Sequence, residues 1–296
     1  MKSLWGKIRQ YAALIKLSHT LFALPFALSA IVLLWDQGMF LFSWPKLVYI
    51  VLAFASFRGF AMAFNRISDA FFDAQNPRTR NREIPMGVLS KKEVLFFALL
   101  LLFLGFFFAY LLNPLAVKLA PLAAFLLVFY SYTKRFTYLC HFWLGAAIGQ
   151  APLAVDIALI GNITANSLFL FFILLFYIAG FDILYAQQDE EFDRKAGLYS
   201  IPARWGIKKA QLVALVSHIV MLVLLVGLGY FRRLGVLYYI FLSLIAVLLY
   251  LEHREIGLLG QFQKEKIPTA FFNYNALVSI FLFTGLFLDT LVRHYG

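Results

Sequence analysis

The sequence predicts an all-α integral membrane protein, with nine transmembrane helices in a bundle around a central cavity and two cytoplasmic loops rich in aspartate. Of its 296 residues, 62% are hydrophobic, and the mean hydropathy is +0.81. Apolar runs of about 20 residues, the length that a helix needs to cross a bilayer, recur along the whole chain. This composition excludes a soluble globular protein, and we treat residues 1–296 as a single polytopic membrane domain.

The nine expected spans follow one another in order. We place them at about 17–35, 46–65, 94–112, 115–131, 138–160, 166–188, 209–230, 234–251 and 268–291. The first run contains Pro25, and we interpret it as a retained span rather than a cleaved signal peptide. Two connections are long and charged, at about 66–93 and 187–209, and we expect them to face one another across a shared cavity.

The positions of the basic residues predict the orientation. With the N-terminus inside, most of the 26 Lys and Arg residues fall in cytoplasmic segments. We therefore expect a protein of the cell inner membrane with a cytoplasmic N-terminus and both long loops on the cytoplasmic side. The formal charge of +11 follows from this topology, and we expect no nucleic-acid partner. The side opposite the cytoplasm carries Lys46, Lys118, Arg232, Arg233 and Arg293.

Two aspartate-bearing stretches lie where long apolar runs end. They read Asn65-x-x-x-Asp69-x-x-x-Asp73 and Asp182-x-x-Tyr185-x-x-x-Asp189-x-x-x-Asp193. Side chains four residues apart share one helix face, so each stretch presents a column of oxygen ligands. Two carboxylates ~4 Å apart repel by about 4 kcal/mol at an effective dielectric near 20, so such a cluster is kept mainly where cations neutralise it. Oxygen ligands of this kind favour Mg²⁺, and we expect the asparagine and the five aspartates to bind it.

Basic side chains lie near both stretches. Arg78 and Arg82 are four residues apart, and their guanidinium groups match phosphate oxygens bidentately. Lys134-Arg135 and Arg194-Lys195 add cations on the same side of the membrane. Any one of these arginines alone is better explained by the positive-inside rule. Together with the aspartates, they predict a binding site for a diphosphate bridged by Mg²⁺.

Arg58 lies about two helical turns deeper in the membrane than Asn65. An arginine inside an apolar span is costly and indicates a function, so we interpret Arg58 as a clamp for the carboxylate of an acceptor. The alternative is that it snorkels to the interface or pairs with an aspartate. Tyr130 and Tyr185 flank the charged motifs and are expected to line the site, where ring faces stabilise an allylic cation. The five histidines show no metal-like spacing.

At these residues the chain resembles the UbiA superfamily of membrane prenyltransferases, over essentially its whole length. The family motifs are N-D-x-x-D-x-x-x-D and D-x-x-Y-x-x-x-D-x-x-x-D, and this chain departs from them at Arg66, which replaces the first aspartate. The resemblance implies that Arg58 binds the acceptor carboxylate and that Arg78 and Arg82 bind diphosphate. It also implies that five aspartates act in catalysis and that a Y-x-x-x-K-R element contributes to the site. The matching residues are Asn65, Asp69, Asp73, Asp182, Tyr185, Asp189 and Asp193 for the motifs, and Tyr130, Lys134 and Arg135 for the third element.

The resemblance implies Mg²⁺-dependent transfer of a polyprenyl chain from polyprenyl diphosphate to an aromatic carboxylate, 4-hydroxybenzoate, in quinone biosynthesis. Some members of the similar branch prenylate a dihydroxynaphthoate on the futalosine route to menaquinone, so the acceptor stays open. We expect the prenyl tail to lie between helices, in contact with membrane lipid. A polytopic transporter is the competing class, but its ionisable groups should lie near the middle of the bilayer. A lipid-binding scaffold would need no paired magnesium motifs.

Overall fold

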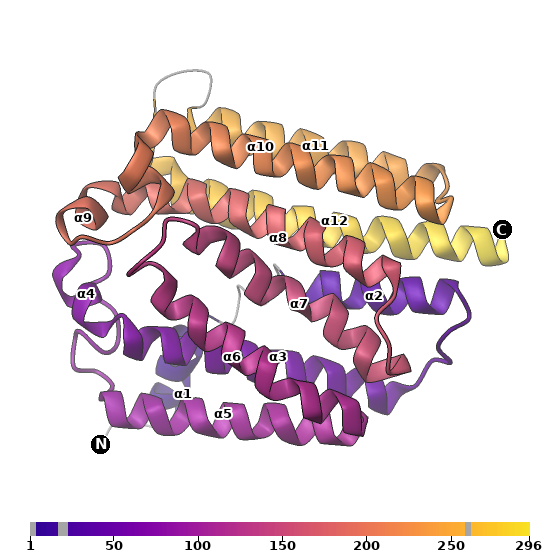
Figure 1. The fold of residues 1–296 in the computed structure, drawn as a ribbon, viewed down its shortest axis with the longest axis horizontal. Coiled ribbons are helices and arrows are strands. Elements are labelled where there is room, and N and C mark those ends of the chain that lie inside the picture. The colour runs from indigo at the N-terminus through magenta and orange to yellow at the C-terminus, as the bar shows by residue number, and fades with distance from the viewer. Residues whose placement is uncertain (1–3, 17–22, 258–261) are drawn as a thin grey trace.

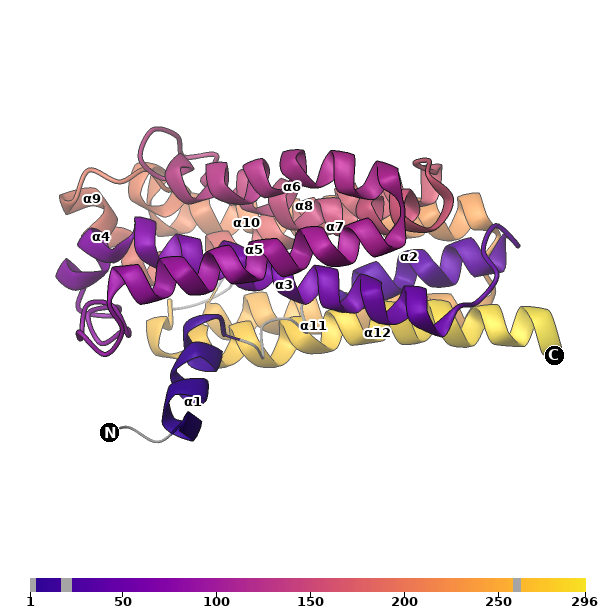
Figure 2. The same ribbon diagram turned by 90° about the horizontal axis from the view of Figure 1, so that it is seen from below.

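A computed structural model describes residues 4–16, 23–257 and 262–296, and every regular element in these segments is a helix. The long helices lie side by side along one direction (Figure 1). The short N-terminal helix α1 (Leu4–Leu14) stands at an angle to this bundle (Figure 2). The prediction of an all-α protein is confirmed over the described residues.

Eight of the described helices are long and apolar enough to cross a membrane. α2 (Leu24–Asp36) is also apolar but has 13 residues, so the predicted count of nine spans is not confirmed. Pro25 lies in the first turn of α2, where its missing N–H breaks no helical hydrogen bond, and residues 17–22 of the first expected span lie outside the described residues. The helices that carry the eight spans are α3 (Trp44–Ser68), α5 (Lys91–Leu112), α6 (Pro114–Thr133), α7 (Cys140–Ile160), α8 (Ala165–Ala186), α10 (Ile201–Arg232), α11 (Val236–Ile256) and α12 (Ile267–Tyr295).

Short helices continue the two aspartate stretches at one end of the bundle. α4 (Ala70–Gln75) follows α3, while η2 (Gln187–Asp189) and α9 (Glu190–Lys195) follow α8. Both ribbon views place α4 and α9 next to each other at this end (Figures 1 and 2). The segments expected to be loops are thus partly helical, because backbone bonds such as Asp73 N–H to Asp69 O (2.8 Å) carry the helical path past the apolar run. A further short helix, η3 (Lys264–Lys266), precedes α12.

The beginning of α10 lies beside the second stretch. The Ser200 hydroxyl accepts a hydrogen bond from Ala203 N–H and caps the helix, with Pro202 in the first turn. Gly206 interrupts α10 with a φ of 77° and a ψ of 169°, a backbone conformation that favours glycine. The span predicted at about 209–230 therefore begins just after this kink, and a separate helical turn precedes Gly206 in a segment that was expected to be a loop.

Helices α7 and α8, which lie next to the site, pack closely against each other. A Cβ atom at Gly145 would lie 2.3 Å from the carbonyl oxygen of Leu175, so only glycine allows this approach. The largest buried apolar cluster joins α2, α7, α8, α10, α11 and α12. Within it, the fully buried Tyr177 hydroxyl donates to the carbonyl oxygen of Asn275 at 2.7 Å.

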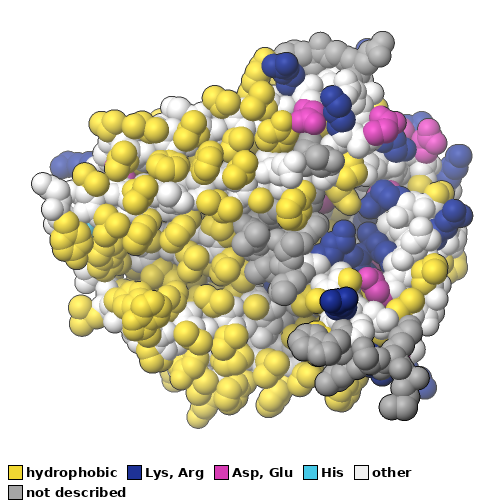
Figure 3. Space-filling view, turned by 180° about the vertical axis from the view of Figure 1, so that it is seen from behind, with side chains coloured by type: hydrophobic (Ala, Val, Ile, Leu, Met, Phe, Trp, Pro, Cys, Tyr) yellow, Lys and Arg dark blue, Asp and Glu magenta, His cyan; other side chains and the backbone are white. Residues whose placement is uncertain are grey.

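On the face seen in Figure 3, hydrophobic side chains cover much of the length of the bundle, and most charged side chains gather at one end. Exposed apolar residues include Leu99, Phe103 and Val223, which would face water at a high cost in a soluble protein. At the opposite end, the buried Asp36 carboxylate pairs with Arg232 and Arg293 at 2.8 Å each and so links α2, α10 and α12. The surface is that of a multi-pass membrane protein.

Candidate active site

The first aspartate stretch forms one wall of a pocket at the end of α3. Asn65 lies in the last turns of α3, and its Nδ2 donates to Asp69 Oδ2 at 2.9 Å. Asp69 ends α3 with an α-helical φ of −91° and ψ of 0°, so the chain continues almost without a break into α4 and Asp73. The side chains of Asn65, Asp69 and Asp73 consequently face the same pocket, as their four-residue spacing predicts.

The segment after α4 folds back onto Asp73. Arg82 Nη1 binds both carboxylate oxygens of the buried Asp73, at 2.7 and 2.8 Å. The Thr79 hydroxyl donates to the carbonyl oxygen of Asp73 at 3.2 Å, and the N–H of Arg78 donates to Asn76 Oδ1 at 2.9 Å. These local bonds turn both predicted diphosphate-binding arginines toward the aspartates.

Asp189, in the second stretch, binds the segment that follows the first stretch, across the pocket. Arg78 donates from Nε and Nη2 to its two carboxylate oxygens, at 2.8 and 2.5 Å, and Asn76 Nδ2 donates at 2.9 Å. The Arg78 guanidinium also lies 5.2 Å from the centre of the Tyr185 ring, and its Nη1 donates to the Tyr185 hydroxyl at 3.2 Å. Residues far apart in the chain therefore form one polar wall.

Asp193 and Asp182 are each held by a different helix. Lys134, just after α6, pairs with the buried Asp193 at 2.8 Å, and the Ser200 hydroxyl donates to the same carboxylate at 3.0 Å. Asp182 lies 2.7 Å from His141 Nδ1, at the start of α7. The other nitrogen of His141, Nε2, accepts the backbone N–H of Ile201 at 3.3 Å, which places the ring proton of a neutral imidazole on Nδ1, donated to Asp182.

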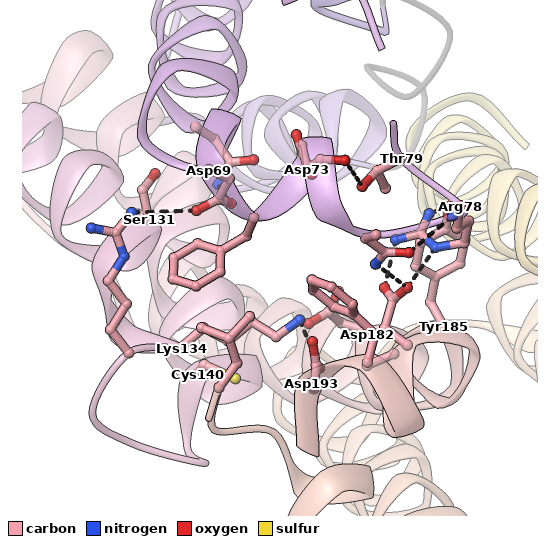
Figure 4. Close-up of a pocket in the computed structure, with 18 of the residues that line it drawn as sticks. Asp69, Asp73, Arg78, Thr79, Ser131, Lys134, Cys140, Asp182, Tyr185 and Asp193 are labelled. Carbon is pink, nitrogen blue, oxygen red and sulfur yellow. Dashed lines mark hydrogen bonds and ion pairs between the residues drawn. The ribbon is translucent and has the colours of Figure 1, made fainter. Parts of the chain in front are cut away.

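These side chains surround one open pocket with about 920 Å³ of space between its lining atoms, part of it continuous with the exterior. Figure 4 shows Asp69 and Asp73 on one wall, and Asp182, Tyr185 and Asp193 on the other. Most of the residues that the sequence predicted for the site line this pocket, but Arg58, Arg194 and Lys195 do not. Those that line it are Asn65, Asp69, Asp73, Arg78, Arg82, Tyr130, Lys134, Arg135, Asp182, Tyr185, Asp189 and Asp193.

The charges in the pocket shift the pKa values of its members. Burial and the neighbouring Asp73 raise the pKa of Asp69, against the opposing effect of Lys134. Burial alone would lower the pKa of Lys134, but Asp193 and Asp189 outweigh it, and the pKa of Lys134 is raised. Burial likewise opposes the charged form of Arg78, and Asp189 outweighs it and raises the pKa of this guanidinium. Both cations are therefore held firmly in their charged form.

Each aspartate of the two stretches is bound to a basic or imidazole side chain. A metal ion would compete with these partners for the carboxylates. Over the described residues, no three Asp, Glu, His or Cys side chains lie close enough together to hold a metal ion. The donor set nevertheless fits Mg²⁺, because it consists of carboxylate and amide oxygens that outnumber the one thiol and one imidazole in the pocket. The partners that occupy the carboxylates are Arg135, Arg82, His141, Arg78 and Lys134, on Asp69, Asp73, Asp182, Asp189 and Asp193 respectively.

Arg58 lies outside the pocket. Its Nη1 donates to the carbonyl oxygens of Ile15 and Lys16, at 3.1 and 3.5 Å, just after the end of α1. These partners are backbone carbonyl oxygens and not the carboxylate of an aspartate. The acceptor role that the resemblance implies for Arg58 stays a prediction.

Several polar residues beside the predicted aspartates have no role assigned from the sequence. Asn76 and His141 each bind a predicted aspartate, and Ser200 binds Asp193 while it caps α10. The spacing of the histidines gives no reason to select His141, because it is not that of a metal site. The position of His141, a polar residue in the first turn of an apolar span, could have marked it as a candidate for the site. That position does not specify which residue His141 binds.

Comparisons with known proteins agree with this geometry. A family model described as the UbiA prenyltransferase family matches residues 23–277. A 4-hydroxybenzoate octaprenyltransferase of Methylococcus capsulatus (strain Bath) is 30% identical over 270 residues, which cover 86% of this chain and 91% of the relative. The protein of the same name from Vibrio parahaemolyticus is 31% identical over 219 residues, which cover 72% of this chain and 76% of the relative.

Solved structures share the fold. The apo structure of a UbiA homolog from Aeropyrum pernix K1 is 28% identical, with a TM-score of 0.81, covering 92% of this chain and 98% of that one. A UbiA homolog from Archaeoglobus fulgidus, solved bound to GPP and Mg²⁺, is 20% identical, with a TM-score of 0.68, covering 94% of this chain and 99% of that one. At that identity, the second likeness concerns the fold alone.

Proposed function

Because the chain belongs to the UbiA prenyltransferase family, we propose that it transfers a polyprenyl chain from polyprenyl diphosphate to a hydroxylated aromatic carboxylate. The observation that carries this proposal is the shared pocket into which both aspartate stretches and three basic side chains converge. A departing diphosphate is a multivalent anion that is stabilised by fixed cations and metal ions. The basic side chains are Arg78, Arg82 and Lys134.

Donor binding exchanges the ion pairs of the pocket. The three basic side chains that now neutralise aspartates turn to the phosphate oxygens, where guanidinium groups bind bidentately. The aspartates that they release become available to Mg²⁺. The ion pairs that are exchanged are Arg78–Asp189, Arg82–Asp73 and Lys134–Asp193.

Both stretches have the ligands for a metal ion. Asn65, Asp69 and Asp73 would hold one Mg²⁺, and Asp189 and Asp193, with Asp182, would hold another. When bound, the ions supply positive charge that stabilises the diphosphate as it leaves. In support, the Archaeoglobus fulgidus homolog, a chain of the same fold, binds GPP together with Mg²⁺.

The proposed reaction breaks the bond between the allylic carbon and the diphosphate oxygen, and the electron pair leaves with diphosphate. The ring carbon beside the acceptor hydroxyl forms the new carbon–carbon bond and then loses its proton. Tyr130 and Tyr185 present ring faces to the allylic cation. Asp182, whose position is set by His141, is the proposed proton acceptor.

The surroundings of the pocket suit a lipid donor. The prenyl tail extends from the pocket between apolar helices toward lipid, where each buried CH₂ contributes about 0.8 kcal/mol. The acceptor is 4-hydroxybenzoate, by analogy with the two octaprenyltransferases, and its carboxylate is bound near the cytoplasmic end of α3, where the resemblance implicates Arg58. A dihydroxynaphthoate is the second candidate, because Arg66 departs from the family motif. The enzyme would lie in the cell inner membrane with its N-terminus and pocket on the cytoplasmic side.

The test uses purified protein in detergent with Mg²⁺ and a prenyl diphosphate, offered 4-hydroxybenzoate and 1,4-dihydroxy-6-naphthoate in competition. We expect one of them to be alkylated, and we expect Asp69→Ala and Asp189→Ala each to lower turnover by at least about 100-fold. The matched control is Glu191→Gln, an exposed acid in the second stretch, which should retain turnover. Flux of a solute into vesicles without any prenylated product would instead support a transporter, and full turnover in the aspartate variants would remove them from the metal site.

A further inference from the structure

Asn76 is a buried amide in the wall of the pocket that belongs to neither aspartate stretch. It is 7% exposed and lies directly after α4, with a φ of −82° and a ψ of 121°. This extended conformation is the one that a residue before a proline prefers, and Pro77 follows. The carbonyl oxygen of Asn76 accepts the N–H groups of Thr79 and Arg80, at 3.0 and 2.9 Å. The backbone therefore fixes where the amide side chain begins.

Both ends of the Asn76 side chain are used. Its Oδ1 accepts the N–H of Arg78 at 2.9 Å, and its Nδ2 donates to Oδ1 of Asp189, 113 residues later in the chain, at 2.9 Å. A carboxylate only accepts and a backbone N–H only donates, so these partners determine which way the amide points. A neutral side chain thus ties the turn after α4 to η2 on the other side of the pocket.

The two carboxylate oxygens of Asp189 have different partners. Oδ1 accepts from Asn76 Nδ2 and from Arg78 Nε, whereas Oδ2 accepts from Arg78 Nη2 at 2.5 Å. When Arg78 turns to a phosphate oxygen, both of its bonds to Asp189 are lost. The bond from Asn76 remains, because a neutral amide is attracted to phosphate much less than a guanidinium is. Asp189 is then held through Oδ1, and its Oδ2 is released.

We propose that Asn76 is a positioning residue, which holds Oδ1 of Asp189 and so leaves Oδ2 oriented for a divalent cation. This inference rests on the proposed function. Carboxylates that bind metal ions are themselves held by hydrogen bonds, and the loss of such a partner weakens metal binding by about tenfold or more. Asn76 and Arg78 therefore act on Asp189 in opposite ways. Arg78 neutralises the carboxylate and competes with the cation, whereas Asn76 orients the carboxylate and leaves its charge in place.

The contacts of Asn76 favour positioning over direct coordination of the cation. Its amide oxygen, the atom that could bind a hard cation, already accepts the N–H of Arg78 within the turn. Its amide nitrogen faces Asp189 and has no lone pair to offer a metal ion. Asn76 consequently acts through Asp189.

The test measures the Mg²⁺ requirement of wild type, Asn76→Ser, Asn76→Ala and the control Gln75→Ala. A serine hydroxyl can accept the N–H of Arg78 as the asparagine does, but it is too short to reach Asp189. Mg²⁺ is titrated in thermal unfolding experiments in detergent, with and without inorganic diphosphate. We expect the half-saturating Mg²⁺ concentration to rise by about tenfold in both Asn76 variants. Gln75→Ala should match wild type, because this exposed amide donates only to its own helix, at Phe71 O.

The serine variant separates positioning from a purely structural role. Asn76→Ser should melt above Asn76→Ala without metal, because the turn is kept, while its Mg²⁺ requirement stays as high as that of Asn76→Ala. A wild-type Mg²⁺ requirement in Asn76→Ser would show that Asn76 serves only the turn, and it would overturn the proposal. A lower requirement would overturn it as well, because Asn76 would then compete with the cation as Arg78 does. So would the absence of any Mg²⁺-induced shift in wild type under both conditions.

The same titration distinguishes this inference from the proposed function. If wild type transfers no prenyl group while Asn76→Ser needs about ten times more Mg²⁺, the proposed function fails and the positioning role stands. If wild type does transfer a prenyl group but the Mg²⁺ requirement is unchanged in Asn76→Ser, the positioning role fails and the proposed function stands.

Discussion

Arg78 competes with Mg²⁺ for the same carboxylate, and this competition can be measured. In Arg78→Met, Asp189 loses two charge-assisted hydrogen bonds, at 2.8 and 2.5 Å, and keeps the bond from Asn76 at 2.9 Å. Removing one partner of a buried ion pair costs about 3–5 kcal/mol. Asp189 is 8% exposed but Arg78 is 28% exposed, and Asn76 remains, so we expect a loss of about 2–3 kcal/mol in the absence of metal. At roughly 2–4 °C per kcal/mol, the melting temperature falls by about 5–10 °C.

The opposite effect is expected when Mg²⁺ is added. In wild type the ion must displace Arg78 from Asp189, whereas in Arg78→Met the carboxylate is already free of it. A competition of about 2 kcal/mol corresponds to a roughly 30-fold difference in apparent affinity. The stabilisation by a given Mg²⁺ concentration should therefore be larger in the variant.

The assay is a thermal unfolding series in detergent, with Mg²⁺ titrated into wild type, Arg78→Met and the control Arg80→Met. Arg80 is exposed in the same segment, so its variant reports the loss of one positive charge without the ion pair. A Mg²⁺-induced shift in Arg78→Met that is equal to or smaller than that of wild type would refute the exchange of partners at Asp189. Donor KM should also rise in Arg78→Met, because the phosphate oxygens lose a guanidinium.

Two further predictions concern the helices behind the pocket. His141→Asn places its amide near the position of Nδ1, where it can donate to Asp182. His141→Gln places its amide near the position of Nε2, where its oxygen can accept the Ile201 N–H. Turnover should therefore be about tenfold higher in the asparagine variant. The reverse order would show that the contact with the α10 backbone, and not Asp182, is what the histidine serves. Gly145→Ala should lower stability by about 1–3 kcal/mol, because its Cβ would lie 2.3 Å from Leu175 O. An unchanged melting temperature for this variant would show that α7 and α8 separate at little cost.

Hydropathy was sufficient to predict where the membrane-spanning helices lie in the chain. The apolar runs located eight spans, because a helix in lipid must be about 20 residues long and satisfy its own backbone. The ends of the helices were less predictable. The turn before Gly206 in α10 is polar enough to resemble a loop, and its helical form depends on the Ser200 cap and on packing beside the second stretch.

The residues of the site were predictable where the type and spacing of the side chains are enough to indicate their role. Aspartates at four-residue spacing share a helix face in any helix, and all five aspartates of the two stretches line the pocket. Their partners were not predictable in this way. Asn76 belongs to no motif that specifies Asp189, and His141 reaches Asp182 only because α7 packs against α8.

The sequence by itself determined a membrane-spanning helical chain with two acidic stretches and neighbouring cations, since hydrophobic length, helical period and charge are local properties. Only the tertiary structure decided which cation holds which carboxylate, why Arg58 points to the end of α1, and that Arg66 lies buried without a partner for its Nε among the described residues. Those outcomes depend on distances between helices that are far apart in the chain, and no local pattern of residues encodes them.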